Sequence, residues 1–371
     1  MSFTTLVLLS LMSTVILYNV IQAEAQTLQG NSGSNNTLVF SLPELYSNVA
    51  KSVVQVAAVN ETDPFASSSL GSGFIYDNVG HIITSSTIVP TNNARVSVTF
   101  SDGTLYRARA VGIDEYNDLA VLLIEDQVPA EKLIPLPLGN STELRIGEQV
   151  ATIGYPFGLP SVLDAGVVGT MGVLLPMYNT PESPPAFSIP DTIVTDLTTD
   201  AGNSGGPLFN MQGEVVGMTV SQVITVSGIS FSVPSNIISK IAPSLIERGL
   251  YQHPWIGLSG IDMTPEIARA IGLEEPRGFL VIEAAPGGPM DTAGVRGGDT
   301  PVQLDGREIA IGGDVVLAID DREIRKIEDV LGYLAQETEV GDTVTVTVWR
   351  DGQIIEIPMT VGVRPPLQDS P

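Results

Sequence analysis

The segment Asp200-Ala201-Gly202-Asn203-Ser204-Gly205-Gly206-Pro207 decides how this chain folds and what chemistry it can carry. Glycines on both sides of one serine let the backbone turn sharply, so that the hydroxyl is exposed. Adjacent backbone N–H groups then converge, and those of Gly202 and Ser204 can hold a developing oxyanion. A lone segment of this kind also fits a simple glycine-rich turn. The pattern therefore makes Ser204 a candidate nucleophile and Gly202, Asn203 and Ser204 a candidate oxyanion hole.

This segment belongs to the last of four blocks that follow one another along the chain. They are residues 71–89 (GSGFIYDNVGHIITSSTIV), 100–122 (FSDGTLYRARAVGIDEYNDLAVL), 147–169 (GEQVATIGYPFGLPSVLDAGVVG) and 195–218 (TDLTTDAGNSGGPLFNMQGEVVGM). Taken in order, the blocks resemble the protease domain of the HtrA/Deg family of trypsin-like serine proteases. The resemblance implies a chymotrypsin-like double β-barrel with the active site in the cleft between the barrels.

The resemblance also points to the parts of a catalytic triad, which needs a nucleophile, a base and a carboxylate that orients the base. Ser204 matches the nucleophile, and Asp118 matches the orienting aspartate. Thr87 stands where the family carries its catalytic histidine. A threonine hydroxyl has no basic site that titrates near neutral pH, so we expect the chain to be impaired as an endopeptidase.

The chain contains only two histidines, His81 and His253. His81 lies six residues before Thr87 on an extended segment, where each residue advances about 3.3 Å. The family also carries a histidine at this earlier position beside its catalytic one. His253 lies in the stretch YQHPW between the two expected domains. We therefore expect neither histidine to replace the missing base.

Residues 53 to 233 alternate short β-branched runs with turn signals such as Asp102-Gly103. This spacing favours many short strands and hence an all-β barrel or sandwich. Helical spacing of apolar residues predicts helices at 42–51, 235–247 and 325–336. The expected fold class is mostly β, a chymotrypsin-like double β-barrel followed by a PDZ domain.

The second domain begins with Trp255-Ile256-Gly257-Leu258, which resembles the carboxylate-binding loop of PDZ domains. Backbone N–H groups of such a loop bind the C-terminal carboxylate of a peptide, which adds as a strand to the sheet edge. The helix at 325–336 would form the other wall. Its apolar residues Ile327, Leu331 and Leu334 either line the peptide pocket or belong to the core. Residues 300–313 resemble an insertion, because a second GGD sequence follows the first.

The expected organisation has five parts, which run from the N-terminus to the C-terminus. They are a signal peptide or N-terminal anchor (1–25), a flexible linker (26–38), the protease domain (39–248), the PDZ domain (253–364) and a disordered tail (365–371). Residues 6–23 are nearly all apolar or small, and Ala23-Glu24-Ala25 is an A-x-A cleavage pattern. The chain is therefore expected to be exported, either secreted or membrane-anchored at the cell surface.

Composition excludes several other classes of function. The chain has no cysteine, which rules out disulfides and thiolate chemistry, and two histidines are too few for a multi-histidine metal site. The formal net charge of −25 repels nucleic acid. We expect no cofactor and no metal.

Three functions fit these observations. The first is an HtrA-like homologue in extracytoplasmic protein quality control, catalytically impaired, that binds unfolded polypeptides or peptide C-termini. The second is an active serine endopeptidase that uses Ser204 with an unconventional base. The third is a peptide-binding scaffold that acts through the PDZ domain. The resemblance further implies a homotrimer, with Phe40, Leu42 and Tyr46 near the contacts.

Overall fold

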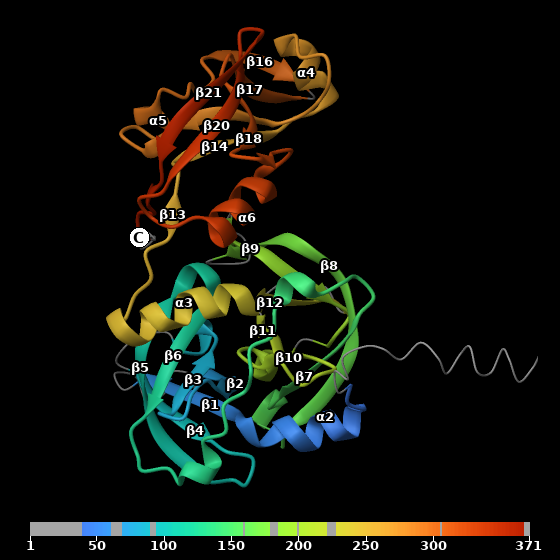
Figure 1. Cartoon of the computed structure of the whole chain (residues 1–371), viewed down its shortest axis with the longest axis vertical. Helices are drawn as coiled ribbons and strands as arrows, with labels where there is room; N and C mark the ends of the chain where they lie inside the picture. Colours follow the sequence, from blue (N-terminus) through green and yellow to red (C-terminus); the bar gives the residue numbers. More distant parts are fainter. Residues whose placement is uncertain are drawn as a thin grey trace, which may run out of the picture. The chain divides into compact units, whose positions relative to one another are not determined.

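The computed structural model describes residues 39–60, 69–89, 94–158, 160–178, 185–198, 200–220, 228–304 and 306–366 (Figure 1). The expected signal peptide or anchor and the linker lie outside these residues, as do residues 367–371 of the expected tail. No helix in the described ranges is long and apolar enough to cross a bilayer.

The first six strands close into a barrel in the order β1-β2-β3-β6-β5-β4. They are β1 (Val53–Asn60), β2 (Ser69–Ile75), β3 (His81–Thr84), β4 (Ala94–Thr99), β5 (Leu105–Asp114) and β6 (Leu119–Ile124). The strands are rich in β-branched residues, which pack well on a pleated surface. Val54, Ile75 and Leu122 are fully buried in its core.

The next six strands close into a second barrel in the order β10-β11-β12-β9-β8-β7. They are β7 (Gln149–Gly154), β8 (Val162–Tyr178), β9 (Pro185–Thr195), β10 (Pro207–Asn210), β11 (Val215–Val220) and β12 (Ser230–Pro234). The Ser204 loop is the connection that leads into β10. The candidate nucleophile is thus positioned by the second barrel, and Thr87 and Asp118 by the first.

Helices and short turns flank the barrels. They are α2 (Leu42–Val49), α3 (Ser235–Arg248) and the 3₁₀ helices η1 (Ala50–Ser52), η2 (Ser86–Ile88), η3 (Glu115–Asn117), η4 (Ala130–Lys132), η5 (Ser141–Glu143), η6 (Pro156–Gly158) and η7 (Ala201–Asn203). The helix expected at 235–247 is confirmed as α3, and its N-cap is Pro234. Ser235 is the first helical residue, and its hydroxyl donates to the carbonyl of Gly139 (2.7 Å). The helix expected at 42–51 ends as the 3₁₀ turn η1.

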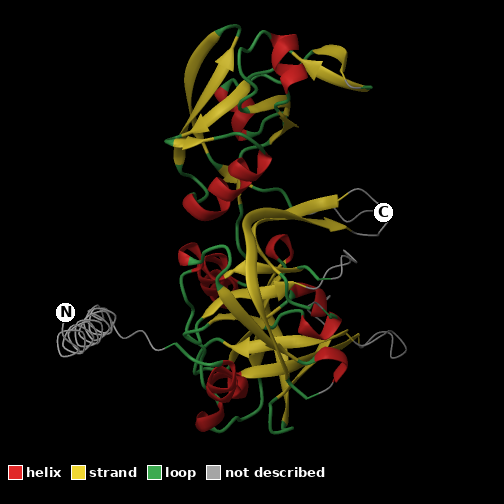
Figure 2. Ribbon diagram, turned by 90° about the vertical axis from the view of Figure 1, so that its right-hand side faces the viewer, coloured by secondary structure: helices red, strands yellow, loops and turns green. Residues whose placement is uncertain are grey.

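The remaining elements form the C-terminal unit, seen with its strands in yellow in Figure 2. Its main sheet has the order β14-β15-β18-β20-β21, with β19 paired to β18. The elements are β13 (Pro254–Trp255), β14 (Leu258–Asp262), α4 (Pro265–Ile271), β15 (Phe279–Ala284), α5 (Pro289–Ala293), β16 (Thr300–Leu304), β17 (Arg307–Ile311), β18 (Val315–Ile319), β19 (Arg322–Glu323), α6 (Ile327–Glu337), β20 (Thr343–Arg350), β21 (Gln353–Thr360) and β22 (Gly362–Val363). The segment 300–313 forms a separate hairpin, β16–β17. β14 pairs only with β15, so it is an edge strand.

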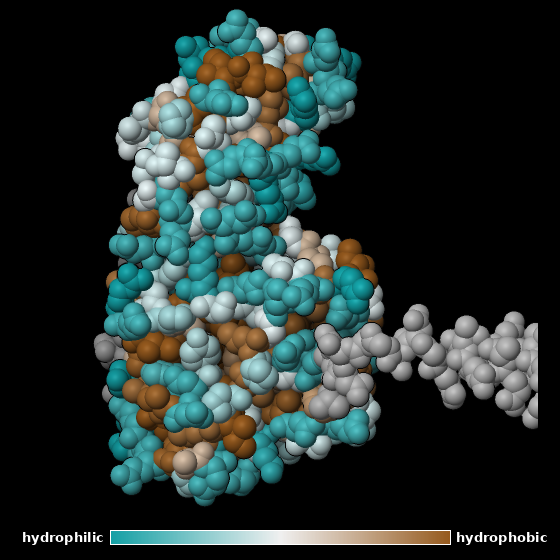
Figure 3. All heavy atoms as spheres, viewed as in Figure 1, coloured by the Kyte–Doolittle hydropathy of each residue, from teal (hydrophilic) through white to brown (hydrophobic). Residues whose placement is uncertain are grey.

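Two closed barrels followed by a separate sheet confirm the expected mostly β fold class. On the face shown in Figure 3, hydrophilic residues are spread over the surface and hydrophobic residues form separate groups between them. Phe40, Leu42 and Tyr46 are partly buried against a core cluster to which both barrels contribute.

Candidate active site

Ser72 holds the Ser204 loop in place from the first barrel. Its N–H donates to the carbonyl of Ser204 (2.8 Å), and its hydroxyl donates to the carbonyl of Gly202 (2.6 Å). The Ser72 hydroxyl also accepts the N–H of Tyr155 (2.9 Å). Ser72 is fully buried and Ser204 is 3% exposed. The two barrels thus meet at this loop, and Ser72 is a positioning residue that the sequence analysis did not identify.

Gly205 can be replaced by no other residue without displacing the neighbouring backbone. Its φ is +79°, and an added methyl group would lie 2.3 Å from the carbonyl oxygen of Ser72 and 2.8 Å from the N atom of Ser85. The loop therefore packs directly against the segment that ends at Thr87. This is the physical reason for a glycine immediately after Ser204.

The carboxylate of Asp118 lies on the other side of that segment, and Asp118 has no exposed surface. Its Oδ1 accepts the hydroxyls of Ser85 (2.7 Å) and Ser86 (2.8 Å) and the N–H of Thr87 (3.1 Å). Its Oδ2 accepts the Ser85 hydroxyl at 2.8 Å. The backbone of Asp118 has φ +51°, a left-handed conformation that few residues other than glycine adopt. Both carboxylate oxygens are therefore occupied by the 85–87 segment.

Thr87 is exposed, whereas the two residues before it, Ser85 and Ser86, are buried. Its Oγ1 lies 2.6 Å from the hydroxyl oxygen of Ser85. Because the one hydroxyl proton of Ser85 is donated to Asp118, the proton between these two hydroxyls comes from Thr87. The result is a chain of hydrogen bonds from Thr87 through Ser85 to Asp118.

Burial raises the pKa of Asp118 to about 6, against the lowering effect of the hydrogen bonds from Ser85, Ser86 and the Thr87 N–H. A carboxyl group removed from water loses the solvation of its charge, which favours the neutral form. Asp118 is therefore mostly ionised at neutral pH and mostly protonated at pH 5.

The donors of Asn203, which was expected in the oxyanion hole, are directed to its own loop. Its N–H donates to the carbonyl of Asp200 (2.9 Å) within η7, and its side-chain amide donates to the carbonyl of Thr198 (3.3 Å). The Asn203 amide is therefore already used by the local turn. The candidate oxyanion donors are reduced to the N–H groups of Gly202 and Ser204.

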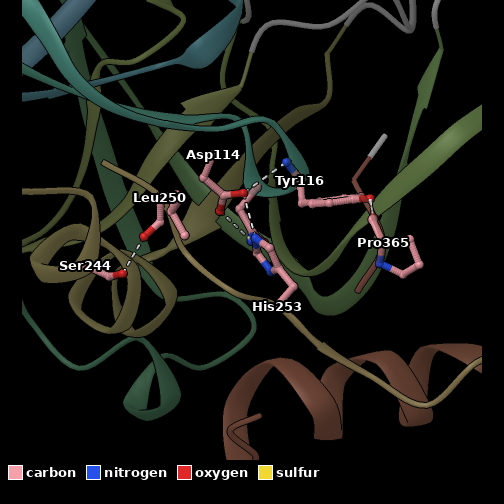
Figure 4. Close-up of polar contacts among 7 residues, drawn as sticks. Asp114, Tyr116, Ser244, Leu250, His253 and Pro365 are labelled. Carbon is pink, nitrogen blue, oxygen red and sulfur yellow. Dashed lines mark hydrogen bonds and ion pairs between the residues drawn. The ribbon is translucent and has the colours of Figure 1, made fainter. Parts of the chain in front are cut away.

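Both histidines are bound to carboxylates of their own. His81, in β3, has its Nδ1 2.6 Å from Oδ2 of Asp77. His253 has its Nε2 2.7 Å from Oδ1 of Asp114, and Figure 4 shows the two side chains facing one another. In the same view the hydroxyl of Tyr116 donates to the carbonyl of Pro365 (2.6 Å). These contacts support the expectation that neither histidine acts as a base for Ser204.

A groove of about 1200 Å³ lies along the exposed edge of β14. Its lining consists of Leu258, Ser259, Gly260, Ile261, Asp262, Thr264, Ile267, Phe279, Leu304, Arg307, Glu308, Ile309 and Ile327. Of the residues expected to bind a peptide, Leu258 and Ile327 line this groove. Leu334 is 5% exposed and lies in the core, and Leu331 is half-buried and outside the lining.

The loop before β14 is held by backbone hydrogen bonds. The carbonyl of Ile256 accepts the N–H of Met290 (3.0 Å), and that of Gly257 accepts the N–H of Ala285 (2.7 Å). Gly257 has φ +71°, and the ring of Trp255 lies against it. Two of the four loop carbonyls therefore point into the domain.

Known families match both parts of the chain. Residues 71–218 match the trypsin-like peptidase domain, and residues 254–361 match the PDZ domain. The chain is HtrA/DegP-like, a trypsin-like serine protease homologue with a C-terminal PDZ domain.

Relatives and solved structures agree with this assignment. The chain is 34% identical over 306 residues to a probable periplasmic serine endoprotease DegP-like of Hahella chejuensis, covering 81% of this chain and 59% of that protein. A relative with the same name in Marinomonas sp. is 34% identical over 303 residues, covering 80% and 58%. The HtrA-type protease AlgW with a tripeptide superposes with a TM-score of 0.68 at 28% identity, covering 88% of this chain and 98% of that one. The chain thus spans about three-fifths of the length of its curated relatives.

Among the described residues, no three His, Asp or Glu side chains are grouped so that they could hold a metal ion.

Proposed function

We propose that this HtrA/DegP-like chain is an exported protein of extracytoplasmic quality control that binds unfolded polypeptides and peptide C-termini but does not cleave them efficiently. The observation that carries the proposal is the hydrogen-bond chain Thr87–Ser85–Asp118. By the resemblance, Thr87 stands at the position of the triad's base, and its hydroxyl donates to Ser85. The hydroxyls of Thr87 and Ser85 have no basic site that titrates near neutral pH, so neither can take the proton of Ser204 as a histidine would.

The missing base has a large effect on rate. Removing one triad member costs on the order of 10⁶ in kcat, and the residual oxyanion stabilisation retains only about 10³ over water. Ser72 of the first barrel nevertheless holds the Ser204 loop through the carbonyls of Gly202 and Ser204. An ordered loop without a base supports a site that binds an extended chain without cutting it.

The exposed edge of β14 supports the second part of the proposal. An edge strand with an apolar groove beside it can take up an extended peptide as an additional strand. Solved HtrA-type structures in this fold contain bound tripeptide and decapeptide. Relatives named as periplasmic proteins support an extracytoplasmic location.

An active endopeptidase is the second candidate, because the relatives are named as endoproteases and Ser204 is retained. A fluorophosphonate probe distinguishes the two, since only an activated serine reacts. We expect Ser204 to remain unlabelled while fluorescein-labelled, reduced and carboxymethylated α-lactalbumin still binds. Labelling that Ser204→Ala abolishes would favour the active enzyme, and failure to bind the unfolded probe would refute the binding function.

The homotrimer remains a proposal from the resemblance. Only part of the surface of three residues is left for contacts with other subunits, because they pack on the core cluster of this chain. These residues are Phe40, Leu42 and Tyr46. Light scattering coupled to size-exclusion chromatography measures the mass directly.

A further inference from the structure

The two faces of the C-terminal sheet are covered by different elements. Along β15, Phe279 and Val281 pack in one apolar cluster with residues of α6, whereas Leu280 and Ile282 pack in another. β14 follows the same alternation, since Leu258 belongs to the first cluster and Ile261 to the second. The edge of β14 therefore lies between two different walls.

The hairpin β16–β17 forms the second wall. Leu304, Ile309 and Ile311 pack with Ile267 of α4 against Leu280, and Figure 1 shows β16, β17 and α4 side by side. Leu304 and Arg307 are paired across the hairpin, so their side chains share one face. Both line the groove along β14.

The guanidinium of Arg307 forms no ion pair at this wall. Arg307 is exposed, and its side chain has no hydrogen bond or salt bridge with any described residue. Two described carboxylates, Asp262 and Glu308, also line the groove. Asp262 accepts the N–H of Ile327 (3.0 Å), and Glu308 lies 3.4 Å from the amide of Gln303, and neither forms a salt bridge with Arg307. Glu308 follows Arg307 in the strand, so the two side chains leave the strand on opposite faces, although both residues line the groove.

A peptide added to β14 presents its side chains alternately to the two walls, because successive residues of a strand point to opposite faces. If the C-terminal side chain lies on the face of Leu258 and Phe279, the residues one and three places before it lie on the face of the hairpin. These two residues then meet Leu304 and Arg307.

We propose that the β16–β17 hairpin is a second specificity wall of the peptide groove, and that Arg307 selects an acidic side chain one or three residues before the peptide C-terminus. This proposal rests on the proposed binding of peptide C-termini and adds which peptides are preferred, namely those with an acidic side chain near the C-terminus. An exposed ion pair of this kind is screened by salt, so the selectivity falls at high ionic strength.

The test is fluorescence anisotropy with the full chain and N-terminally fluoresceinated decapeptides that end in Val or Phe. The peptides carry Asp, Ala or Lys at the positions one and three before the end, and C-terminally amidated versions serve as controls. We expect about threefold to tenfold tighter binding of the Asp peptides than of the Lys peptides at low salt. Arg307→Glu should reverse this order. Arg145→Glu, which changes the net charge equally at an exposed site in the second barrel, should leave it unchanged.

Two results would overturn the inference and are distinguishable. If free-acid peptides bind and amidated peptides do not, but Asp and Lys peptides bind equally or Arg307→Glu has no effect, the hairpin is no specificity wall while C-terminal binding stands. If no free-acid peptide binds better than its amide, the proposed binding of C-termini fails, and this inference fails with it.

Discussion

The hydroxyl of Ser85 lies 2.7 and 2.8 Å from the two carboxylate oxygens of Asp118. In a working triad the orienting aspartate accepts the N–H of the histidine that serves as base. Here Ser85 takes that acceptor site, and Thr87 binds to Ser85 in turn. Under the proposed function, Ser85 therefore occupies the carboxylate oxygens that would orient a histidine.

Restoring a base should restore part of the chemistry. We expect Thr87→His to raise casein hydrolysis by about 10²- to 10⁴-fold over Ser204→Ala, because this is the usual contribution of general acid–base catalysis. The additional change Ser85→Ala should increase the rate about fivefold more, since one Oδ of Asp118 becomes free to orient the imidazole. Initial rates of fluorescent casein cleavage measure both steps. Equal rates for the single and double variants would show that Ser85 does not obstruct Asp118.

The stability of the protein should depend on pH through Asp118. Its pKa is raised in the folded state to about 6 from an unfolded value near 4, so its stabilising effect is complete below about pH 4 and is lost as pH rises through about 6. We expect the free energy of unfolding of the wild type, relative to Asp118→Asn, to fall by about 2 to 3 kcal/mol from pH 4 to pH 7. Urea denaturation of both proteins across this range provides the difference. A constant difference would mean that Asp118 has an ordinary pKa.

Gly205→Ala should be far more destabilising than Gly103→Ala. Both glycines have similar φ values, +79° and +82°, but an added methyl group has no neighbour within 4 Å at Gly103. The backbone strain of about 1 kcal/mol is therefore common to both. The clash with Ser72 should cost about 3 kcal/mol more, as overpacking in a closely packed interior does. Urea midpoints of the two variants measure this, and equal midpoints would contradict the close packing of the Ser204 loop.

An ion pair with a buried carboxylate, Arg350–Asp314, lies in the C-terminal unit, and its disruption should be costly. Arg350 donates from Nε (2.7 Å) and from one Nη (2.6 Å) to the carboxylate of Asp314, which is 1% exposed. Arg350→Ala leaves this buried carboxylate without its partner, and we expect a loss of about 3 to 5 kcal/mol. Arg322→Ala, at an exposed pair with Glu337, should cost less than about 1 kcal/mol. Thermal unfolding followed by circular dichroism measures the stability of both variants. Similar losses of stability would contradict the expectation that the buried pair contributes more.

The family resemblance carried by the glycine loop and the four ordered blocks was enough to predict the two barrels. The catalytic roles of Ser204 and Asp118 stay predictions. The Ser72 contacts were not predictable, because they join residues 130 positions apart that only the closed barrels bring together. The hydrogen bond from the Asn203 N–H to the Asp200 carbonyl was not predictable either, because the sequence does not show the direction of a backbone N–H. GSG at 71–73 was the available signal for a close backbone approach near Ser72.

The hairpin at 300–313 shows the same limit in the C-terminal unit. Its repeated GGD pattern predicted an insertion, but the register that places Leu304 and Arg307 on one face depends on the position of the turn. Leu334 was assigned ambiguously because pocket and core residues have the same helical spacing. Packing of α6 on the sheet places it in the core.

The most direct test of the account is casein cleavage by the purified wild-type protein beside Ser204→Ala and Thr87→His under identical conditions. We expect the wild type and Ser204→Ala to be indistinguishable, while Thr87→His produces fragments. Robust cleavage by the wild type that Ser204→Ala abolishes would contradict it.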